Sequence, residues 1–364
     1  MSDMRKEVGS TFWLLPDELD RLPKRSLKSP EVLNIGEGYL STCRSAIGMV
    51  LDTIRAERKV ALIPAFTCES VLIPFIKRGY EAVPYPVEKD LGVNWNSFKT
   101  LMDKICPSVI LIHAYFGFDT IKNLRLHVHE IRERGIVVIE DMTQSMFSSV
   151  TPLVSDFHVG SIRKWMPLPD GAFVTLSLGN SVAEEDEELV NAKVKAMTEK
   201  GKWIMYGEGD KETFRKDFSE AERILDSREN PFRMSSISKE IYATTDISRM
   251  REIRRMNYRY LEREIWNDEQ LSEQFESMLS PLGENECPFH FPVLVKNNRQ
   301  KLQQYLAAND IYATVIWRIP EEFERKINDD ARYIYNHILC FHIDQRYDLD
   351  DMERIVSVLK HYSA

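Results

Sequence analysis

The fold is constrained most by short apolar runs that alternate with segments of helical periodicity between residues 59 and 177. These runs are rich in Val, Ile and Leu and too short for core helices, so they are typical of buried strands. Strands that alternate with helices at this spacing form βαβ units. The pattern therefore predicts an α/β fold with a mostly parallel sheet between helices. Strands are expected at 59–66, 81–87, 108–116, 136–141 and 171–177, with helices at 70–80 and 123–135.

A second group of elements follows a charged region that begins near residue 180. Residues 239–266 have the pattern of one long helix or two stacked helices. This order predicts two domains: an N-terminal arm and a large domain over residues 1–235, then a linking helix and a small α+β domain over 236–364. In the small domain, strands are expected at 289–295 and 312–317, and helices at 298–311 and 349–362.

The charge balance excludes several classes of partner. The chain has 48 basic and 57 acidic residues, and such an acidic protein binds nucleic acid and anionic membrane surfaces poorly. No apolar run approaches the roughly 20 residues that a membrane helix needs, and the polar start has no signal-peptide pattern. Five cysteines without a CxxC pair favour neither a disulfide framework nor a metal site. The cytoplasm is therefore the expected compartment.

The chemical candidates lie between residues 136 and 171. Asp141 ends a buried strand, and ligands of open α/β sheets bind at the carboxyl ends of strands. Lys164 closes the Ser-x-x-Lys sequence at 161–164. Pyridoxal phosphate (PLP) needs these two groups, an amine for the Schiff base and a carboxylate that keeps the pyridine nitrogen protonated. The residues alone leave open that Arg163 and Lys164 form a surface basic pair and that Asp141 caps a helix.

Several motifs of the chain resemble the DegT/DnrJ-type sugar aminotransferases, which are PLP enzymes of fold type I. The resemblance covers roughly residues 34–177 and 287–360. Its segments are ALIPAFTCES (61–70), RGYEAVPYPVEKD (78–90), LIHAYFG (111–117), VVIEDMTQ (137–144) and ILCFHIDQRYDLDDMERIVSVL (338–359). It implies a large domain with a mostly parallel sheet of the seven-stranded type and a smaller α+β C-terminal domain.

For the cofactor ring, the resemblance implies a role for each matching residue. Lys164 is expected to form the Schiff base, Asp141 to pair with the pyridine nitrogen, and Gln144 to lie near the ring hydroxyl. His113, at the end of the strand in LIHAYFG, is expected among the cofactor contacts. Cys68 stands where the family has an aromatic residue, so Phe66, Tyr115 and Phe116 are alternatives for stacking on the ring.

For the cofactor phosphate, the resemblance implies Ser161 together with Arg44 and Ser45. These two residues stand in TCRSAI (42–47), where the family has a phosphate-binding helix N-terminus. Backbone N–H groups and the helix dipole favour an anion there. The glycine-rich turn that the family has after the lysine is PLPDGA in this chain.

The activity implied is transfer of an amino group from an amino acid donor to a keto sugar, which in this family is often nucleotide-linked. Related dehydratases have lost the lysine, whereas this chain has Lys164. The resemblance also implies a homodimer. Aromatic residues among charges, Trp203, Tyr206, Phe214 and Phe218, are expected to be exposed in a monomer and buried in such a dimer.

Two alternatives stay open. A PLP enzyme acting on another amine or amino acid would need an arginine for the substrate carboxylate, and Arg318 and Arg233 are the candidates. A non-catalytic protein of the same fold would lack the lysine or the carboxylate, and this sequence has both.

Overall fold

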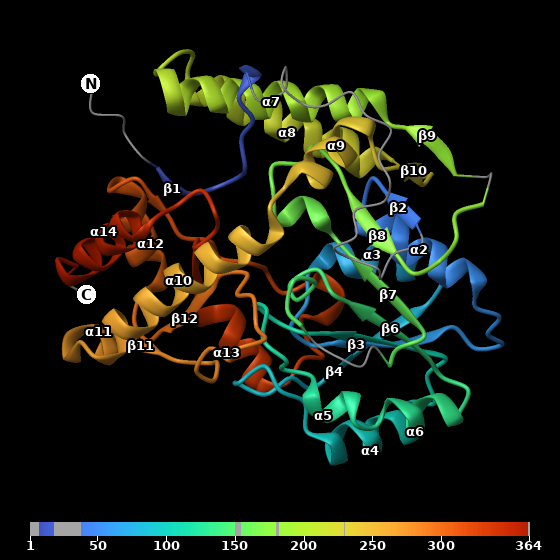
Figure 1. The fold of residues 1–364 in the computed structure, drawn as a ribbon. Helices are drawn as coiled ribbons and strands as arrows, with labels where there is room; N and C mark the ends of the chain where they lie inside the picture. The colour runs from blue at the N-terminus through green and yellow to red at the C-terminus, as the bar shows by residue number, and fades with distance from the viewer. Residues whose placement is uncertain (1–6, 18–37, 150–153, 180–181, 229, 363–364) are drawn as a thin grey trace. The chain divides into compact units, whose positions relative to one another are not determined.

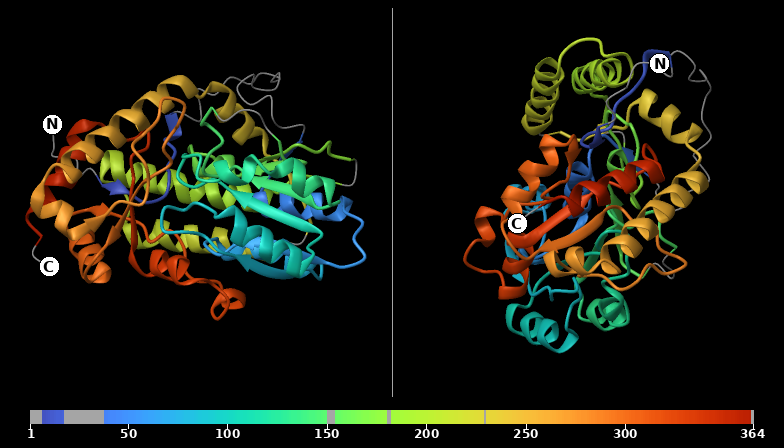
Figure 2. Two further views of the ribbon diagram at one scale, coloured as in Figure 1. Left: turned by 90° about the horizontal axis from the view of Figure 1, so that it is seen from below. Right: turned by 90° about the vertical axis from the view of Figure 1, so that its left-hand side faces the viewer.

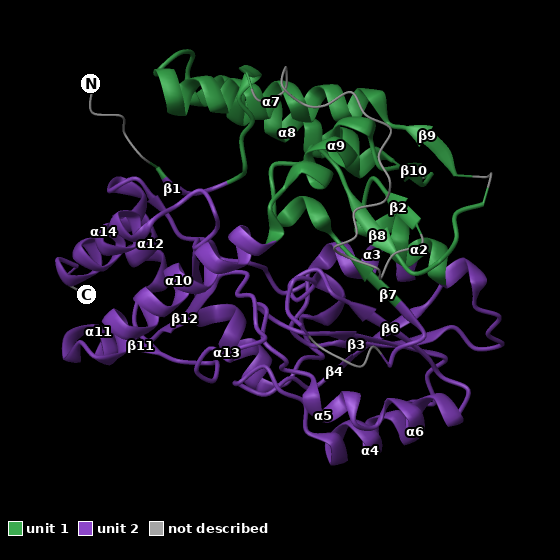
Figure 3. Cartoon of the chain, in the orientation of Figure 1, with its two compact units in different colours: residues 1–7, 11–50, 158–247 green, residues 8–10, 51–157, 248–364 purple. Residues whose placement is uncertain are grey.

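The computed structural model describes residues 7–17, 38–149, 154–179, 182–228 and 230–362. It contains two compact units (Figure 3). Unit 1 holds residues 1–7, 11–50 and 158–247, and unit 2 holds 8–10, 51–157 and 248–364. The predicted α/β class is confirmed, whereas the domain boundary at residue 235 stays a prediction. Much of the N-terminal arm lies outside the described residues.

Unit 2 contains the parallel strands that the apolar runs predict (Figure 1). They lie in the order β4-β3-β5-β6, and β3 and β5 are buried along their whole length. The bounds are β3 (Val60–Pro64), β4 (Glu81–Tyr85), β5 (Val109–His113) and β6 (Val137–Asp141). The connecting helices are α3 (Glu69–Lys77), α4 (Trp95–Ile105), α5 (Lys122–Arg125) and α6 (Val128–Glu133). The single helix predicted over 123–135 is wrong, because the chain turns at His127, whose ring stacks on Trp95.

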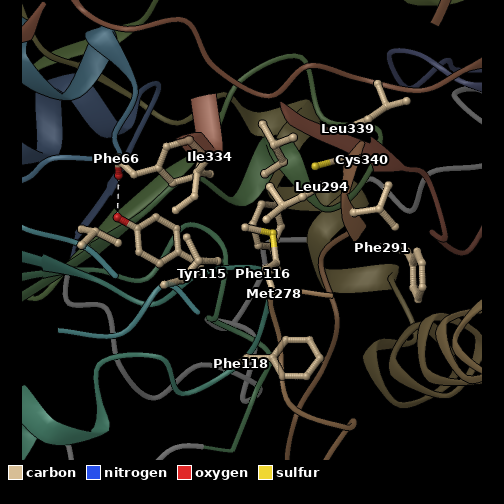
Figure 4. Close-up of a cluster of buried hydrophobic side chains, with 14 of the residues drawn as sticks. Phe66, Tyr115, Phe116, Phe118, Met278, Phe291, Leu294, Ile334, Leu339 and Cys340 are labelled. Atoms are coloured by element: carbon tan, nitrogen blue, oxygen red, sulfur yellow. Dashed lines mark hydrogen bonds between the residues drawn. The ribbon is translucent and has the colours of Figure 1, made fainter. Parts of the chain in front are cut away.

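The C-terminal part of unit 2 carries an antiparallel sheet in the order β11-β12-β14. Its strands are β11 (Phe275–Glu276), β12 (Phe291–Val295) and β14 (Ile338–Phe341), while β1 (Val8–Gly9) pairs with β13 (Ile311–Tyr312). Its helices are α10 (Ile247–Trp266), α11 (Glu269–Gln274), α12 (Arg299–Ala308), α13 (Asp329–His337) and α14 (Leu349–Lys360). A single hydrophobic core, which includes Phe66, Tyr115 and Phe291, joins this part to the parallel strands (Figure 4).

Unit 1 is a mixed sheet with helices. Its strands lie in the order β7-β8-β2-β10-β9, with β2 antiparallel to both β8 and β10. They are β2 (Gly38–Leu40), β7 (Phe157–Gly160), β8 (Ala172–Val174), β9 (Ala183–Glu185) and β10 (Phe232–Arg233). Its helices are α2 (Cys43–Thr53), α7 (Glu187–Tyr206), α8 (Lys211–Ser227) and α9 (Ser236–Thr244).

Helices α7 and α8 pack side by side (Figure 2). Phe214 is buried in this helix pair and packs on Trp203, with 5.6 Å between the ring centroids. The prediction that Phe214 is exposed in a monomer is therefore wrong, because the helix pair itself covers the ring. Tyr206 is exposed, as predicted. In the described part of the chain, no helix is long and apolar enough to cross a membrane.

A buried ion pair fixes the end of β6 to α5. Glu140 is fully buried and accepts hydrogen bonds from Arg125 at 2.5 and 3.0 Å. Burial raises the pKa of Glu140, and the guanidinium of Arg125 opposes that shift. The pair holds the strand whose last residue is Asp141, one of the candidate site residues.

Replacing Arg125 with Met is expected to lower the free energy of unfolding by about 3–5 kcal/mol at neutral pH, because a buried carboxylate loses its partner. Without the cation, the pKa of Glu140 rises further, so the folded state takes up a proton as the pH falls. The loss should therefore be smaller at pH 5 than at pH 7.5. Urea unfolding at both pH values measures this, and an equal loss at both would contradict it.

Candidate functional site

The carboxyl ends of β5 and β6 bring His113 and Asp141 together in unit 2. The two residues are register partners in the parallel pairing, and both are buried. His113 Nδ1 donates to the backbone oxygen of Asp141 at 3.0 Å and lies 3.8 Å from Asp141 Oδ2. Because a carbonyl oxygen only accepts, this contact places a proton on Nδ1. Asp141 Oδ1 accepts from the backbone N–H of Thr143 at 2.9 Å, which fixes the carboxylate.

Gln144 lies three residues beyond Asp141 and is also buried. Its Oε1 accepts from the backbone N–H of Phe116 at 2.8 Å, so the carbonyl end of the amide is occupied. The NH₂ end is the one left to donate, which is the chemistry that a ring hydroxyl or phenolate oxygen requires. The role of Gln144 stays a prediction.

Aromatic rings surround His113 in unit 2. Its ring centroid lies 4.7 Å from that of Tyr115 and 5.8 Å from that of Trp317. Trp317 also packs on Phe66 at 4.8 Å. Trp317 could not be predicted as a site residue. The strand predicted at 312–317 is wrong beyond Tyr312, because β13 ends there and Trp317 lies on the loop that follows. No local pattern connects that loop to β5.

Cys68 precedes α3 and supplies no ring. Its Sγ lies 3.0 Å from Ser70 Oγ. The neighbouring Thr67 is held by Tyr335, whose hydroxyl accepts from the Thr67 N–H at 2.8 Å. In unit 2, the rings of His113, Tyr115 and Trp317 are thus better candidates for stacking on a planar ligand ring than the thiol of Cys68.

In unit 1, Ser161 and Lys164 lie on one tight turn. A 3₁₀ turn (Ile162–Lys164) carries the lysine, and Ser161 comes directly before it. Ile162 and Trp165 are fully buried and anchor the turn, while Lys164 is half-buried. The backbone N–H of Arg163 donates to Gly171 at 3.2 Å, which closes the loop that follows the lysine.

Arg44 and Ser45 lie at the start of α2, also in unit 1. The backbone N–H of Ser45 donates to Thr42 Oγ1 at 3.1 Å, so Thr42 caps the helix. Thr42 is a further residue of this site, and a threonine just before a helix start is a capping signal that the sequence offers. The Arg44 guanidinium binds Asp226 at 2.8 Å. The backbone at this helix start, rather than the Arg44 side chain, is therefore the part that suits an anion.

Helix α8 places carboxylates near the basic residues of unit 1. Lys193 is buried and forms an ion pair with Glu222. Burial opposes ionisation of Glu222, but the positive charges of Arg163 and Lys193 prevail and lower its pKa. Glu222 and Asp226 thus balance the basic charge beside the turn that carries Lys164.

A groove of about 920 Å³ lies in unit 2. Its lining residues include Arg299, Arg318, Trp317 and several amide side chains, but no Asp or Glu. Arg299 Nη1 donates to the carbonyl oxygen of Tyr335 at 2.6 Å, and burial lowers the pKa of Arg299. A groove with two guanidinium groups and no carboxylate suits an anionic group on a ligand. Among the described residues, no cluster of His, Cys, Asp or Glu could hold a metal ion.

No protein-family profile matches the sequence, and no curated protein matches it. Solved structures do match. Helicobacter pylori PseC, an aminotransferase of pseudoaminic acid biosynthesis, is 14% identical with a TM-score of 0.70 and covers 98% of this chain and 99% of its own. Spr1654 from Streptococcus pneumoniae, named as a sugar aminotransferase in its PLP form, has 12% identity, a TM-score of 0.68 and 98% coverage of both chains.

A third similar structure is the GDP-4-keto-6-deoxymannose-3-dehydratase ColD with bound GDP-perosamine. It is 13% identical with a TM-score of 0.61 and covers 96% of this chain and 94% of its own. Aminotransferases and a dehydratase thus share one fold, so the fold alone does not choose between the two reactions. The predicted fold is confirmed: this chain has the fold of the sugar aminotransferases.

Proposed function

We propose that this protein is a PLP-dependent aminotransferase that moves an amino group from an amino acid donor to a keto sugar, including one linked to a nucleotide. The observation that carries the proposal is Asp141, a buried carboxylate fixed at the end of a parallel strand and contacted by His113. Lys164 supplies the amine that an aminotransferase requires. The presence of this lysine favours the aminotransferase reaction over the dehydratase reaction. The fold shared with PseC and Spr1654 supports the same assignment.

The side chains present fit the chemistry of PLP. A buried carboxylate suits a protonated pyridine nitrogen, and the Gln144 amide can donate to the ring oxygen. The start of α2, capped by Thr42, offers backbone N–H groups to a phosphate. When bound, PLP supplies an electron sink for the carbon that loses its proton.

The residues have separate tasks in the proposed reaction. Lys164 would attach the cofactor through Nζ, and the same amine, when free, would hold and move the proton that leaves the substrate carbon. Asp141 keeps the ring nitrogen charged. His113, with its proton on Nδ1, would hold the backbone of Asp141 at the strand end, and the N–H of Thr143 would hold the carboxylate.

A two-stage single-turnover experiment tests the proposal. The cofactor-loaded protein is mixed with L-glutamate, L-glutamine or an amino sugar, and the change in cofactor absorbance is followed. A keto sugar, free or nucleotide-linked, is then added without further donor. We expect a donor to convert the cofactor to its amine form and a keto sugar to restore the original spectrum. Failure of every donor to change the spectrum of the loaded protein would overturn the proposal.

A PLP enzyme acting on another amine or amino acid is the second candidate, and the groove in unit 2 favours it. Trp317 lines that groove and also contacts His113. Arg318 is the next residue and is exposed, so it could receive a carboxylate. Arg233 donates instead to the carbonyl oxygen of Gly179. In the experiment above, regeneration by keto acids but by no keto sugar would select this candidate.

We also propose a homodimer in the cytoplasm. The homodimer rests on the resemblance to fold type I enzymes, and the exposed ring of Tyr206 is compatible with it. The cytoplasm fits the cysteines, because Cys43, Cys68, Cys106, Cys287 and Cys340 are all free thiols.

A further inference from the structure

Asp170 lies in the turn that follows Lys164 and is almost completely buried. Its carboxylate binds the start of α9. Oδ2 accepts from the backbone N–H of Ser235 at 3.0 Å, and Oδ1 accepts from the hydroxyls of Ser235 and Ser238. Both serines are fully buried. These three hydrogen bonds join the turn at Asp170 to the start of α9. We call this contact the joint; losing any of its donors would leave the buried carboxylate short of a partner.

The backbone beside this joint connects two further segments of unit 1. The carbonyl oxygen of Gly171 accepts from the N–H of Arg163 at 3.2 Å, on the turn that carries Lys164. The N–H of Gly171 donates to the oxygen of Ser41 at 2.8 Å. Ser41 immediately precedes Thr42, the cap of α2. Gly171 has φ +132°, a conformation that residues with a side chain rarely adopt, so this turn requires glycine.

The segment that leads into α9 is hydrogen-bonded to β2 and to Ser41, the residue after it. The N–H of Met234 donates to the oxygen of Tyr39 at 3.2 Å, and the N–H of Ser41 donates to the oxygen of Phe232 at 2.9 Å. Residues 39–41, 170–171 and 232–235 therefore form a closed ring of contacts in unit 1. The Asp170 carboxylate is the side chain that closes this ring.

We propose that Asp170 is a positioning residue that holds the Lys164 turn in register with the start of α2. The proposal rests on the proposed function, in which Lys164 binds the aldehyde end of PLP and the start of α2 binds its phosphate. A ligand held at two points gains affinity only when both points match its length. Asp170 acts through Gly171 on both points and touches neither end of the ligand itself.

Asp170→Asn is the sharpest test. The amide replaces one carboxylate oxygen with NH₂, so a donor then faces either the Ser235 N–H or the two serine hydroxyls. The turn and the helix start should separate slightly. We expect the affinity for PLP to fall about tenfold or more, while the affinity for pyridoxal, which lacks the phosphate, changes less than about twofold. Both affinities are measured by absorbance titration of the apoprotein.

Glu185→Ala is the matched control. Glu185 also binds the start of α9, through the N–H and hydroxyl of Ser236, but it lies on β9 and not on the lysine turn. This variant should leave both affinities within about twofold of the wild type. Ser238→Ala, which removes a single donor to Asp170, should show the same selective loss of PLP affinity and serves if Asp170→Asn does not fold.

The outcomes separate clearly. An equal loss of affinity for PLP and pyridoxal, or the same selective loss in Glu185→Ala, would show that Asp170 only stabilises the fold. Wild-type PLP affinity in both Asp170→Asn and Ser238→Ala would also overturn the inference. If the wild-type protein takes up neither aldehyde, the proposed function fails, and this inference fails with it.

Discussion

Lys164→Ala is expected to reduce turnover by at least about 10³-fold, because in the proposed function this one amine both attaches the cofactor and carries the proton. The fold should persist. The turn is anchored by Ile162 and Trp165, which are fully buried, whereas the lysine itself is half-buried. Removing its side chain leaves no large apolar cavity, so the free energy of unfolding should change by about 1 kcal/mol or less.

Chemical labelling gives the site directly. Borohydride reduction of the cofactor-loaded protein should fix the cofactor to Lys164, and peptide mapping should find it there and nowhere else. Lys59 is the comparison within the chain, since its amine donates to the carbonyl oxygen of Arg78 at 2.9 Å and is not expected to react. A label on Lys59 or Lys77, or wild-type turnover in the alanine variant, would contradict the assignment.

The parallel strands could be predicted because their signal is local. Runs such as ALIP and VILIH are buried along their whole length, and β3 and β5 coincide with them to within one residue. His113 and Asp141 could be predicted for the same reason, since each is the last residue of such a strand. Ligands of open α/β sheets bind at the carboxyl ends of the strands, so these two residues can be selected without knowing which distant residues pack beside them.

Contacts between distant segments could not be predicted. Trp317 contacts His113 from a position about two hundred residues further along the chain, and the local pattern at 312–317 predicts a strand rather than this contact. The bonds of Asp170 to Ser235 and Ser238 are of the same kind. The exposure of Phe214 was predicted wrongly because its cover, Trp203, lies on the preceding helix. Helix periodicity shows that a face exists, but not what packs on it.

Asp141→Asn is the second large expected effect. The ring nitrogen of PLP must stay protonated to accept electrons, and a carboxylate in contact raises its pKa by about 1–3 units. The substitution keeps the shape and removes the charge. We expect the variant to bind PLP through Lys164 and the phosphate contacts, but to remove the substrate proton about 100-fold more slowly or worse. Stopped-flow absorbance of the half-reaction with the donor measures this rate.

A purely structural role for Asp141 predicts a different result. Asp141 Oδ1 accepts from the N–H of Thr143, and the oxygen of asparagine can accept the same bond. If that bond were the whole role of Asp141, the rate would stay at the wild-type value. Asp156→Asn is the matched control. Like Asp141, Asp156 accepts a hydrogen bond from a backbone N–H, in this case that of Val138 at 2.9 Å. This bond lies at the other end of β6. Its rate should match the wild type, so equal rates for Asp141→Asn and Asp156→Asn would contradict the cofactor role.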